Sequence, residues 1–488
     1  MILHTKSIAR ILGHLMTITG LAMAVPLILA ALGGNPQIIM GFLIPAAFSL
    51  LLGVALSIVY RDADRRITMK DGMILTVLSW FLISCFGAMP YLLTGIVRSP
   101  ISALFESISS YTTTGATILT NVSGLPRSIL FWRSFSQWLG GIGILVLLHS
   151  LIPASFEQQN SILSTETEAI NTDNISFGRR STAKLIYLFY IAMSGTQVLL
   201  LKFCGLNWYD SFIFSFGTSA SGGLNNYSDG LLHVANPAAE AVLAVFMLLS
   251  CVNFALYVRL LRGETEKVHG NTELNAYVGL AAAGVILVTL DLFIHHVYSD
   301  LAESLRFGGF QAISFLTTTG LSNADFNLWP SFSKMVLTIL SFIGGCSTST
   351  GGALKVIRVV IISKMVWRSF TTRIHPNAVV TIKTNGKPVP SNIANKAVAY
   401  TLIFFVLFLS GTFLLTFDPA SDFQSAFTAS GAMLCNIGTG AGVMGMFAEY
   451  HMFGQFSQLV MCFLMLAGRL EIYALLLPFS GSFWREKI

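Results

Sequence analysis

Ten long apolar segments dominate this chain and leave little room for a water-soluble domain. A helix needs about 20 apolar residues to cross the hydrocarbon core of a bilayer, and each segment reaches that length. Only 11% of the 488 residues are charged, whereas a typical soluble protein has about 25%. We therefore predict an all-α polytopic membrane protein with about ten transmembrane helices. The expected spans are 11–33, 37–60, 73–96, 128–152, 183–206, 236–260, 274–298, 331–363, 397–417 and 453–478.

Basic residues gather in every second connection between the expected spans. If the N-terminus is cytoplasmic, the outside segments clearly hold only Arg98, Arg127 and Arg306, and most other Lys and Arg residues lie inside. This bias sets the orientation of membrane proteins, so we expect cytoplasmic N- and C-termini. It also explains the sequence pI of about 9.0 without nucleic acid as a partner.

Four of the outside segments (97–127, 207–235, 299–330 and 418–452) share one pattern. Each begins with a short amphipathic stretch, continues with a polar run and reaches a glycine. In the first three, a phenylalanine precedes that glycine by ten residues, and the fourth is degenerate; the pairs are Phe105 and Gly115, Phe212 and Gly222, Phe310 and Gly320, and Phe427 and Gly438. Recurrence at a spacing near one hundred residues indicates an internal repeat.

Each repeat is predicted to be a spanning helix, a re-entrant half-helix with a loop, and a second spanning helix. Four such units would form four re-entrant pore loops in a pseudo-fourfold arrangement. The expected divisions are a two-helix N-terminal domain at 1–72 and pore repeats at 73–182, 183–273, 274–396 and 397–488.

The four loops have the composition of an ion site. Non-helical backbone at membrane depth survives only when it is buried in protein or lines a water-filled path. Its carbonyl oxygens can replace the water shell of a cation, and the C-terminal ends of the half-helices favour positive charge. The candidate filter residues are Thr113, Thr114, Gly115, Ser221, Gly222, Thr318, Thr319, Gly320, Asn436, Ile437 and Gly438.

These loops resemble the four filters of the Trk/Ktr/HKT superfamily of cation transporters. The matching stretches are Thr-Thr-Thr-Gly-Ala-Thr at 112–117, Ser-Gly-Gly at 221–223, Thr-Thr-Thr-Gly at 317–320 and Asn-Ile-Gly at 436–438. The resemblance extends to 344–355 and 466–472, and it covers nearly the whole chain. Two helices before the first repeat make the chain similar to the bacterial TrkH/TrkG type.

The resemblance implies potassium uptake across the bacterial inner membrane by a homodimer. It also implies a cytosolic TrkA-type regulator that binds nucleotides. The chain itself is expected to bind none, because its sequence contains no Walker A pattern. Glycine at all four filter positions implies potassium as the transported ion, whereas serine in the first filter is associated with sodium.

The inner helix of the third repeat is expected to break. Gly344, Gly345, Gly351 and Gly352 flank a Ser/Thr-rich run, and each glycine costs a helix about 1 kcal/mol relative to alanine. We hypothesise a flexible intramembrane loop that acts as a gate beneath the filter and is met by Arg469. The gate residues are Gly345, Cys346, Ser347, Thr348, Ser349, Thr350, Gly351 and Arg469.

Several charged residues admit other interpretations. Arg469 could instead pair with Glu471 or extend to the membrane interface. Lys355 and Arg358 are expected at the inner interface rather than in the pore. Glu106 suits either cation attraction or a structural role.

Segment 374–396 is predicted to form a cytosolic hairpin around an Asn-Gly turn. It is equally consistent with a regulator-docking element and with an ordinary connection.

Three other functions remain open or less favoured. A sodium-conducting or sodium-coupled member of the same superfamily is the first alternative. A secondary transporter of small solutes would be expected to have two repeats and a midplane site. An enzyme is not expected, because the spans contain no paired carboxylates and no nucleophile with a base. The sequence does not decide between channel-like conduction and proton-coupled symport.

Overall fold

The computed structural model describes residues 3–63, 68–150, 179–440, 445 and 450–485, and it is mostly helical there, with only two short strands in the described part. Three helices open the chain: α1 (Thr5–Ala22), α2 (Ala24–Gly33) and α3 (Pro36–Val59). Helices α1 and α3 pack closely because glycines remove the side chains between them. A Cβ on Gly13 would lie 2.8 Å from the Gly53 carbonyl oxygen, and a Cβ on Gly53 would lie 2.6 Å from the Thr17 nitrogen.

Four groups of helices follow with one plan: a long helix, a short helix and an inner helix. The first group is α4 (Met69–Leu93), α5 (Pro100–Tyr111), η1 (Val122–Gly124) and α6 (Arg127–Ser150). The second is α8 (Arg179–Phe203), α9 (Trp208–Ser219), η3 (Gly230–His233), α10 (Pro237–Ser250), α11 (Phe254–Leu261) and α12 (Thr265–His269). The third is α13 (Thr272–Ile294), α14 (Leu301–Leu316), η4 (Phe326–Leu328), α15 (Ser331–Ile343), α16 (Val356–Ile374), β1 (Lys383–Thr384) and β2 (Lys387–Pro388). The fourth is α17 (Ser391–Leu415), α18 (Phe423–Leu434), η6 (Tyr450–Met452), α19 (Gln455–Arg469), α20 (Tyr473–Leu476), η7 (Leu477–Phe479) and α21 (Gly481–Arg485).

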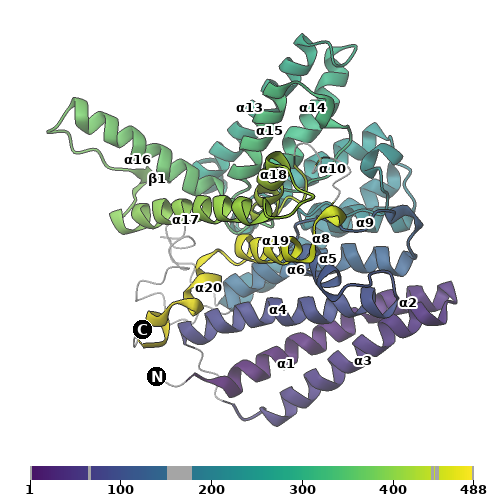
Figure 1. Cartoon of the computed structure of the whole chain (residues 1–488). Helices are drawn as coiled ribbons and strands as arrows, with labels where there is room; N and C mark the ends of the chain where they lie inside the picture. Colours follow the sequence, from purple (N-terminus) through teal and green to yellow (C-terminus); the bar gives the residue numbers. More distant parts are fainter. Residues whose placement is uncertain (1–2, 64–67, 151–178, 441–444, 446–449, 486–488) are drawn as a thin grey trace.

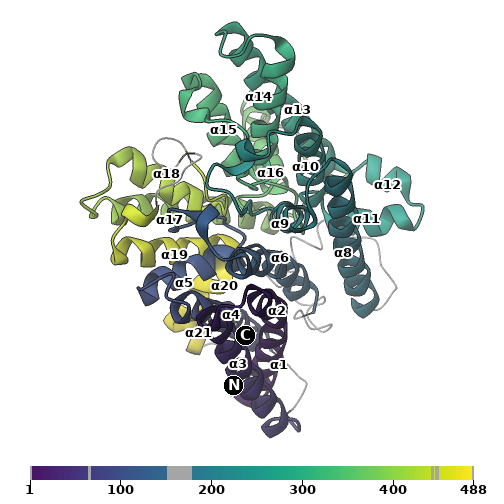
Figure 2. The same ribbon diagram turned by 90° about the vertical axis from the view of Figure 1, so that its right-hand side faces the viewer.

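The four groups surround a common centre, which Figure 2 shows most clearly. Helices α4–α6, α8–α11, α13–α15 and α17–α19 each occupy one side of that centre, and the N-terminal helices lie outside α4. This arrangement agrees with the predicted pseudo-fourfold plan. Of the first predicted repeat, residues 151–178 lie outside the described part of the chain.

The expected spans correspond to helices, although their forms differ. Six helices of the described chain are long and apolar enough to cross a membrane. Two others are bent pairs: α10 and α11 meet at 90°, and α19 meets Tyr473–Phe479 at 120°. The expected span at 331–363 is interrupted, as the sequence predicts, because α15 ends at Ile343 and α16 begins at Val356. The break coincides with the glycine-rich run.

The four short helices begin in the same way. Each has a polar N-cap side chain that accepts a hydrogen bond from a backbone N–H of the first turn; the caps are Ser99, Asn207, Asp300 and Asp422. Such caps satisfy donors that a helix start leaves unpaired. Helices α5, α9, α14 and α18 are therefore defined at their N-terminal ends by local sequence, as well as by packing.

The predicted hairpin is present but short. Strands β1 and β2 pair antiparallel, with Thr384 opposite Lys387. Asn385 and Gly386 both have positive φ, at 50° and 76°, as a two-residue hairpin turn requires. Figure 1 shows α16 and this hairpin extending from the helical body, on the side where α1 begins.

Candidate ion-conduction site

The loops that follow the four short helices have the same backbone shape. Two residues after each helix, one non-glycine residue has a φ of 54°; these are Thr113, Ser221, Thr318 and Asn436. Two residues further on, a glycine also has positive φ: Gly115, Gly223, Gly320 and Gly438, between 69° and 83°. Left-handed backbone is accessible to glycine at little cost. The repeat is therefore a repeat of conformation as well as of sequence.

This geometry corrects the register of the second loop. The sequence pattern equated Gly222 with Gly115, but the backbone equates Gly223 with it. The N–H groups of both Gly222 and Gly223 donate to the Gly217 carbonyl, as those of Thr114 and Gly115 donate to the Ser109 carbonyl. The spacing from phenylalanine to glycine predicts the wrong register here. Phe212 is 41% exposed and is therefore not the counterpart of the buried Phe105.

The four loops contact one another in a closed ring. A Cβ on each of the four glycines would collide with a carbonyl oxygen of the next loop. The pairs are Gly115 with Gly222, Gly223 with Thr319, Gly320 with Ile437, and Gly438 with Thr114. We call Thr114, Gly222, Thr319, Ile437 and these four glycines the carbonyl ring. No side chain fits at the glycines unless the ring deforms.

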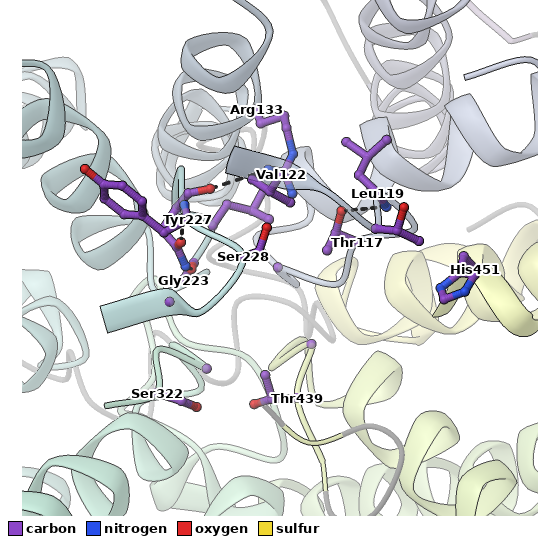
Figure 3. A pocket seen from close by; sticks show the side chains of 17 residues that line it. Thr117, Leu119, Val122, Arg133, Gly223, Tyr227, Ser228, Ser322, Thr439 and His451 are labelled. Atoms are coloured by element: carbon purple, nitrogen blue, oxygen red, sulfur yellow. Dashed lines mark hydrogen bonds between the residues drawn. The ribbon is translucent and has the colours of Figure 1, made fainter. Parts of the chain in front are cut away.

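A cavity of about 250 Å³ opens on one side of the carbonyl ring. Its lining includes all four ring glycines, Gly115, Gly223, Gly320 and Gly438. Figure 3 shows Arg133, Thr117, Tyr227, Ser322, Thr439 and His451 around it. The cavity brings solvent-sized space to the ring, as the mouth of an ion path requires.

Glu106 has a structural role beside this cavity. Its carboxylate lies 2.7 Å from Nε of Arg133 on α6, and both side chains are almost fully buried. Thr117 Oγ1 and the Ile118 N–H also donate to it. Removing one partner of such a pair would leave a buried charge uncompensated. Glu106 therefore holds the first loop and does not face the ring as a free carboxylate.

The residues between α15 and α16 form the expected non-helical loop, 344–355. Part of its backbone pairs with residues at the break between α10 and α11. The Cys346 N–H donates to the Cys251 carbonyl at 2.9 Å, and the Phe254 N–H donates to the Thr348 carbonyl at 3.2 Å. The loop is largely buried. Non-helical backbone at membrane depth needs hydrogen-bond partners within the protein, and these contacts provide some of them.

The same loop contacts residues that come just before the carbonyl ring in the third and fourth loops. The Gly352 N–H donates to Thr318 Oγ1 at 2.8 Å. A Cβ on Gly351 would lie 3.3 Å from the Thr317 carbonyl oxygen, and one on Gly352 would collide with the Cys435 carbonyl. The loop therefore packs directly against the loops that follow α14 and α18.

Arg469 contacts this loop as hypothesised. Its Nη1 donates to the Thr350 carbonyl at 2.6 Å, and its Nη2 lies 3.4 Å from the Gly140 carbonyl. The side chain is buried. The alternative pairing with Glu471 is wrong, because Glu471 accepts from Arg358 at 2.5 Å.

Lys355 and Arg358, expected at the inner interface rather than in the pore, are enclosed by protein. Lys355 has a φ of 75°, and its ammonium donates to the Gly351 carbonyl. Arg358 lies 3.5 Å above the Tyr400 ring and pairs with Glu471. Both residues are buried, because the helix break turns them into the protein where carbonyls, a carboxylate and an aromatic face compensate their charge.

Sequence reasoning missed Glu273. This buried residue lies in the first turn of α13, where an acidic side chain is common for helix-dipole reasons alone. Its Oε1 accepts from both the N–H and the Oγ of Ser347, at 2.6 and 2.7 Å. Ser347 is 74 residues away along the chain, so no local sequence pattern indicates this contact.

Comparison with known proteins identifies the family. A model of the family described as "TrkH: Cation transport protein" matches residues 38–486. The chain belongs to the TrkH family. It is 33% identical to the Trk system potassium uptake protein TrkH of Halomonas elongata over 99% of both chains. It is 31% identical to the protein of that name from Escherichia coli K12, over 99% of this chain and 100% of the other.

A solved structure supports the same fold. The crystal structure of the potassium transporter TrkH from Vibrio parahaemolyticus aligns with a TM-score of 0.88 at 29% identity. It covers 99% of this chain and 100% of that chain. The predicted membership of the superfamily and the all-α membrane fold are confirmed. The family is one of transporters, in agreement with the expectation that the chain is not an enzyme.

Proposed function

We propose that this protein takes up potassium through the carbonyl ring, which acts as its selectivity filter. The observation that carries the proposal is the closed ring itself, in which four glycines from four repeats each abut a carbonyl of the next loop. Carbonyl oxygens can replace the hydration shell of a cation. The similar proteins from Halomonas elongata and Escherichia coli are named as potassium uptake proteins.

Potassium is favoured over sodium by the glycine in every loop. Gly115 occupies the position at which a serine is associated with sodium in the superfamily. The Gly222 carbonyl fills the space that a side chain at position 115 would need. The short helices α5, α9, α14 and α18 end immediately before the ring. Their C-terminal dipoles add negative potential where a cation would shed its water.

The loop at 344–355 is the proposed gate. It contacts the third and fourth filter loops and leaves no helix between α15 and α16. Arg469 places a buried positive charge against it. A cation leaving the ring would meet this charge at short range in a low-dielectric setting, where Coulomb repulsion is strong. Displacing the loop and the arginine together would open the path.

A cytosolic TrkA-type regulator is proposed to act through the hairpin. The Thr272 N–H donates to Asn385 Oδ1 at 2.8 Å, and the Asn385 N–H donates to Thr272 Oγ1 at 2.9 Å. The next residue, Glu273, holds Ser347 of the gate loop. A partner that moves the hairpin would therefore displace the proposed gate through two pairs of hydrogen bonds, one between Asn385 and Thr272 and one between Glu273 and Ser347.

The remaining features of the proposal follow from the family. We place the protein in the bacterial inner membrane as a homodimer, with cytoplasmic termini and the repeat divisions given above. The side that carries the hairpin and α16 (Figure 1) is then the cytoplasmic side.

Growth rescue tests the proposed function. A bacterium lacking potassium uptake is transformed with this gene, with and without a cytosolic regulator, and grown on low potassium. We expect growth when the regulator is present. Failure to rescue in both cases, with the protein present in the membrane, would contradict potassium uptake.

A further inference from the structure

The second filter loop lacks a support that two other loops obtain from their own short helices. In α5, Ser109 Oγ donates to the Ala116 carbonyl at 2.6 Å, just after the ring glycine. In α14, Ser314 Oγ donates to the Leu321 carbonyl at 2.7 Å. The corresponding residue of α9 is Gly217, six residues before Gly223. A glycine has no side chain with which to hold the loop.

The second loop also lacks a ring side chain. Gly222 stands where the other loops have Thr114, Thr319 and Ile437. Gly222 is not among the residues with positive φ, so its backbone does not require glycine. The requirement comes from a neighbour: a Cβ there would overlap Nε2, Cδ and Cγ of Gln137. Gln137 therefore occupies the space that a side chain at 222 would take.

Gln137 comes from the inner helix of the first repeat, α6, and it is fully buried. Its Oε1 accepts from the Leu224 N–H at 3.1 Å. This bond fixes the orientation of the amide and directs Nε2 toward Gly222, where it has no hydrogen-bond partner within the described part of the chain. One turn earlier, Ser134 Oγ lies 3.4 Å from the Leu224 carbonyl.

We propose that Gln137, assisted by Ser134, is a selectivity-determining positioning residue of this transporter. The pair supplies to the second loop, from another repeat, the support that Ser109 and Ser314 supply within theirs. It sets the position of the Gly222 carbonyl in the ring, and hence the fit to the permeating ion. This inference rests on the proposed function of the ring as the filter.

Reversal potentials of the purified protein in liposomes test the inference. Gln137→Ala is expected to lower the potassium-to-sodium permeability ratio by about fivefold or more, because the buried Leu224 N–H loses its acceptor. Gln137→Met keeps the approximate volume and removes the amide, both its acceptor oxygen and its Nε2, so it carries the test if the alanine variant does not fold. Gln197→Ala is the matched control: Gln197 is also fully buried, with an unpartnered Nε2, but it accepts from Ser219 of α9 rather than from the loop.

A second substitution tests the steric part. Gly222→Ala forces Gln137 away from Leu224, so it should reduce uptake and selectivity. The double variant Gln137→Ala, Gly222→Ala removes the collision between the two side chains. It should transport potassium faster than Gly222→Ala alone. The inference is overturned if folded Gln137 variants keep the wild-type ratio, or if the double variant shows no gain.

Gly115→Ser separates this inference from the proposed filter. If Gly115→Ser lowers the ratio and the Gln137 variants do not, only the role of Gln137 is lost. If neither changes the ratio, the filter assignment fails and the inference fails with it.

Discussion

Arg469→Ala is expected to raise the flux of the unregulated transporter. The substitution removes the 2.6 Å hydrogen bond from Nη1 to the Thr350 carbonyl. A hydrogen bond from a charged donor contributes about 1.5–3 kcal/mol. The contact to Gly140 is long at 3.4 Å and adds little. Because about 1.4 kcal/mol is a factor of ten in an equilibrium constant, the closed-to-open ratio should fall about tenfold to a hundredfold.

The assay is rubidium or potassium uptake into liposomes that contain the purified protein without any regulator. Arg98→Ala serves as the control, since Arg98 is exposed and lies in an expected outside segment. Size-exclusion profiles establish that each variant is folded. If folded Arg469→Ala shows wild-type basal flux and undiminished dependence on the regulator, Arg469 only packs against the loop, and the gate lies elsewhere.

Two further substitutions test neighbouring contacts. Glu106→Gln leaves buried Arg133 without its ion pair, so we expect a clearly lower melting temperature and weaker uptake, measured by thermal unfolding in detergent and by flux; an unchanged melting temperature would refute the structural role of Glu106. Asn385→Ala removes the side-chain oxygen that accepts from the Thr272 N–H and keeps the backbone N–H that donates to Thr272 Oγ1. Regulator-stimulated flux should therefore fall severalfold while basal flux stays near wild type; full stimulation would exclude this route.

The fold was largely predictable because its signals are long and repeated. The length of the apolar segments predicts the spanning helices, and the recurrence of the short polar loops predicts the four repeats. The glycines around Cys346 gave the helix break, since several glycines and hydroxyl side chains together weaken a helix. The contact of Arg469 with the loop at 344–355 was predictable because a buried charge in a span needs a partner.

The exact register of the second loop was not predictable by spacing. The glycine pair at 222 and 223 allows two alignments, and Phe212 supported the wrong one. What decides between them is conformation: Gly223 has a φ of 72°, whereas Gly222 is glycine because Gln137 fills its side-chain position. That contact joins residues 85 positions apart, as the numbering shows, and a local pattern carries no information about it.

Partners of buried charges were also beyond local reasoning. Arg469 and Glu471 are close in sequence, yet the turn at Glu471 and Ile472, both with positive φ, directs the carboxylate to Arg358 instead. Glu273 meets Ser347 only because α13 and the gate loop pack together.

The most direct test of the central claim is ion selectivity after serine substitution at each ring glycine. Gly115→Ser, Gly223→Ser, Gly320→Ser and Gly438→Ser are reconstituted in liposomes, and reversal potentials are measured with potassium and sodium on opposite sides. Gly279→Ala is the control, since a Cβ there meets no atom within 4 Å. The account predicts a lower potassium-to-sodium permeability ratio in all four serine variants and an unchanged ratio in the control. Wild-type selectivity in folded Gly115→Ser and Gly223→Ser would contradict it.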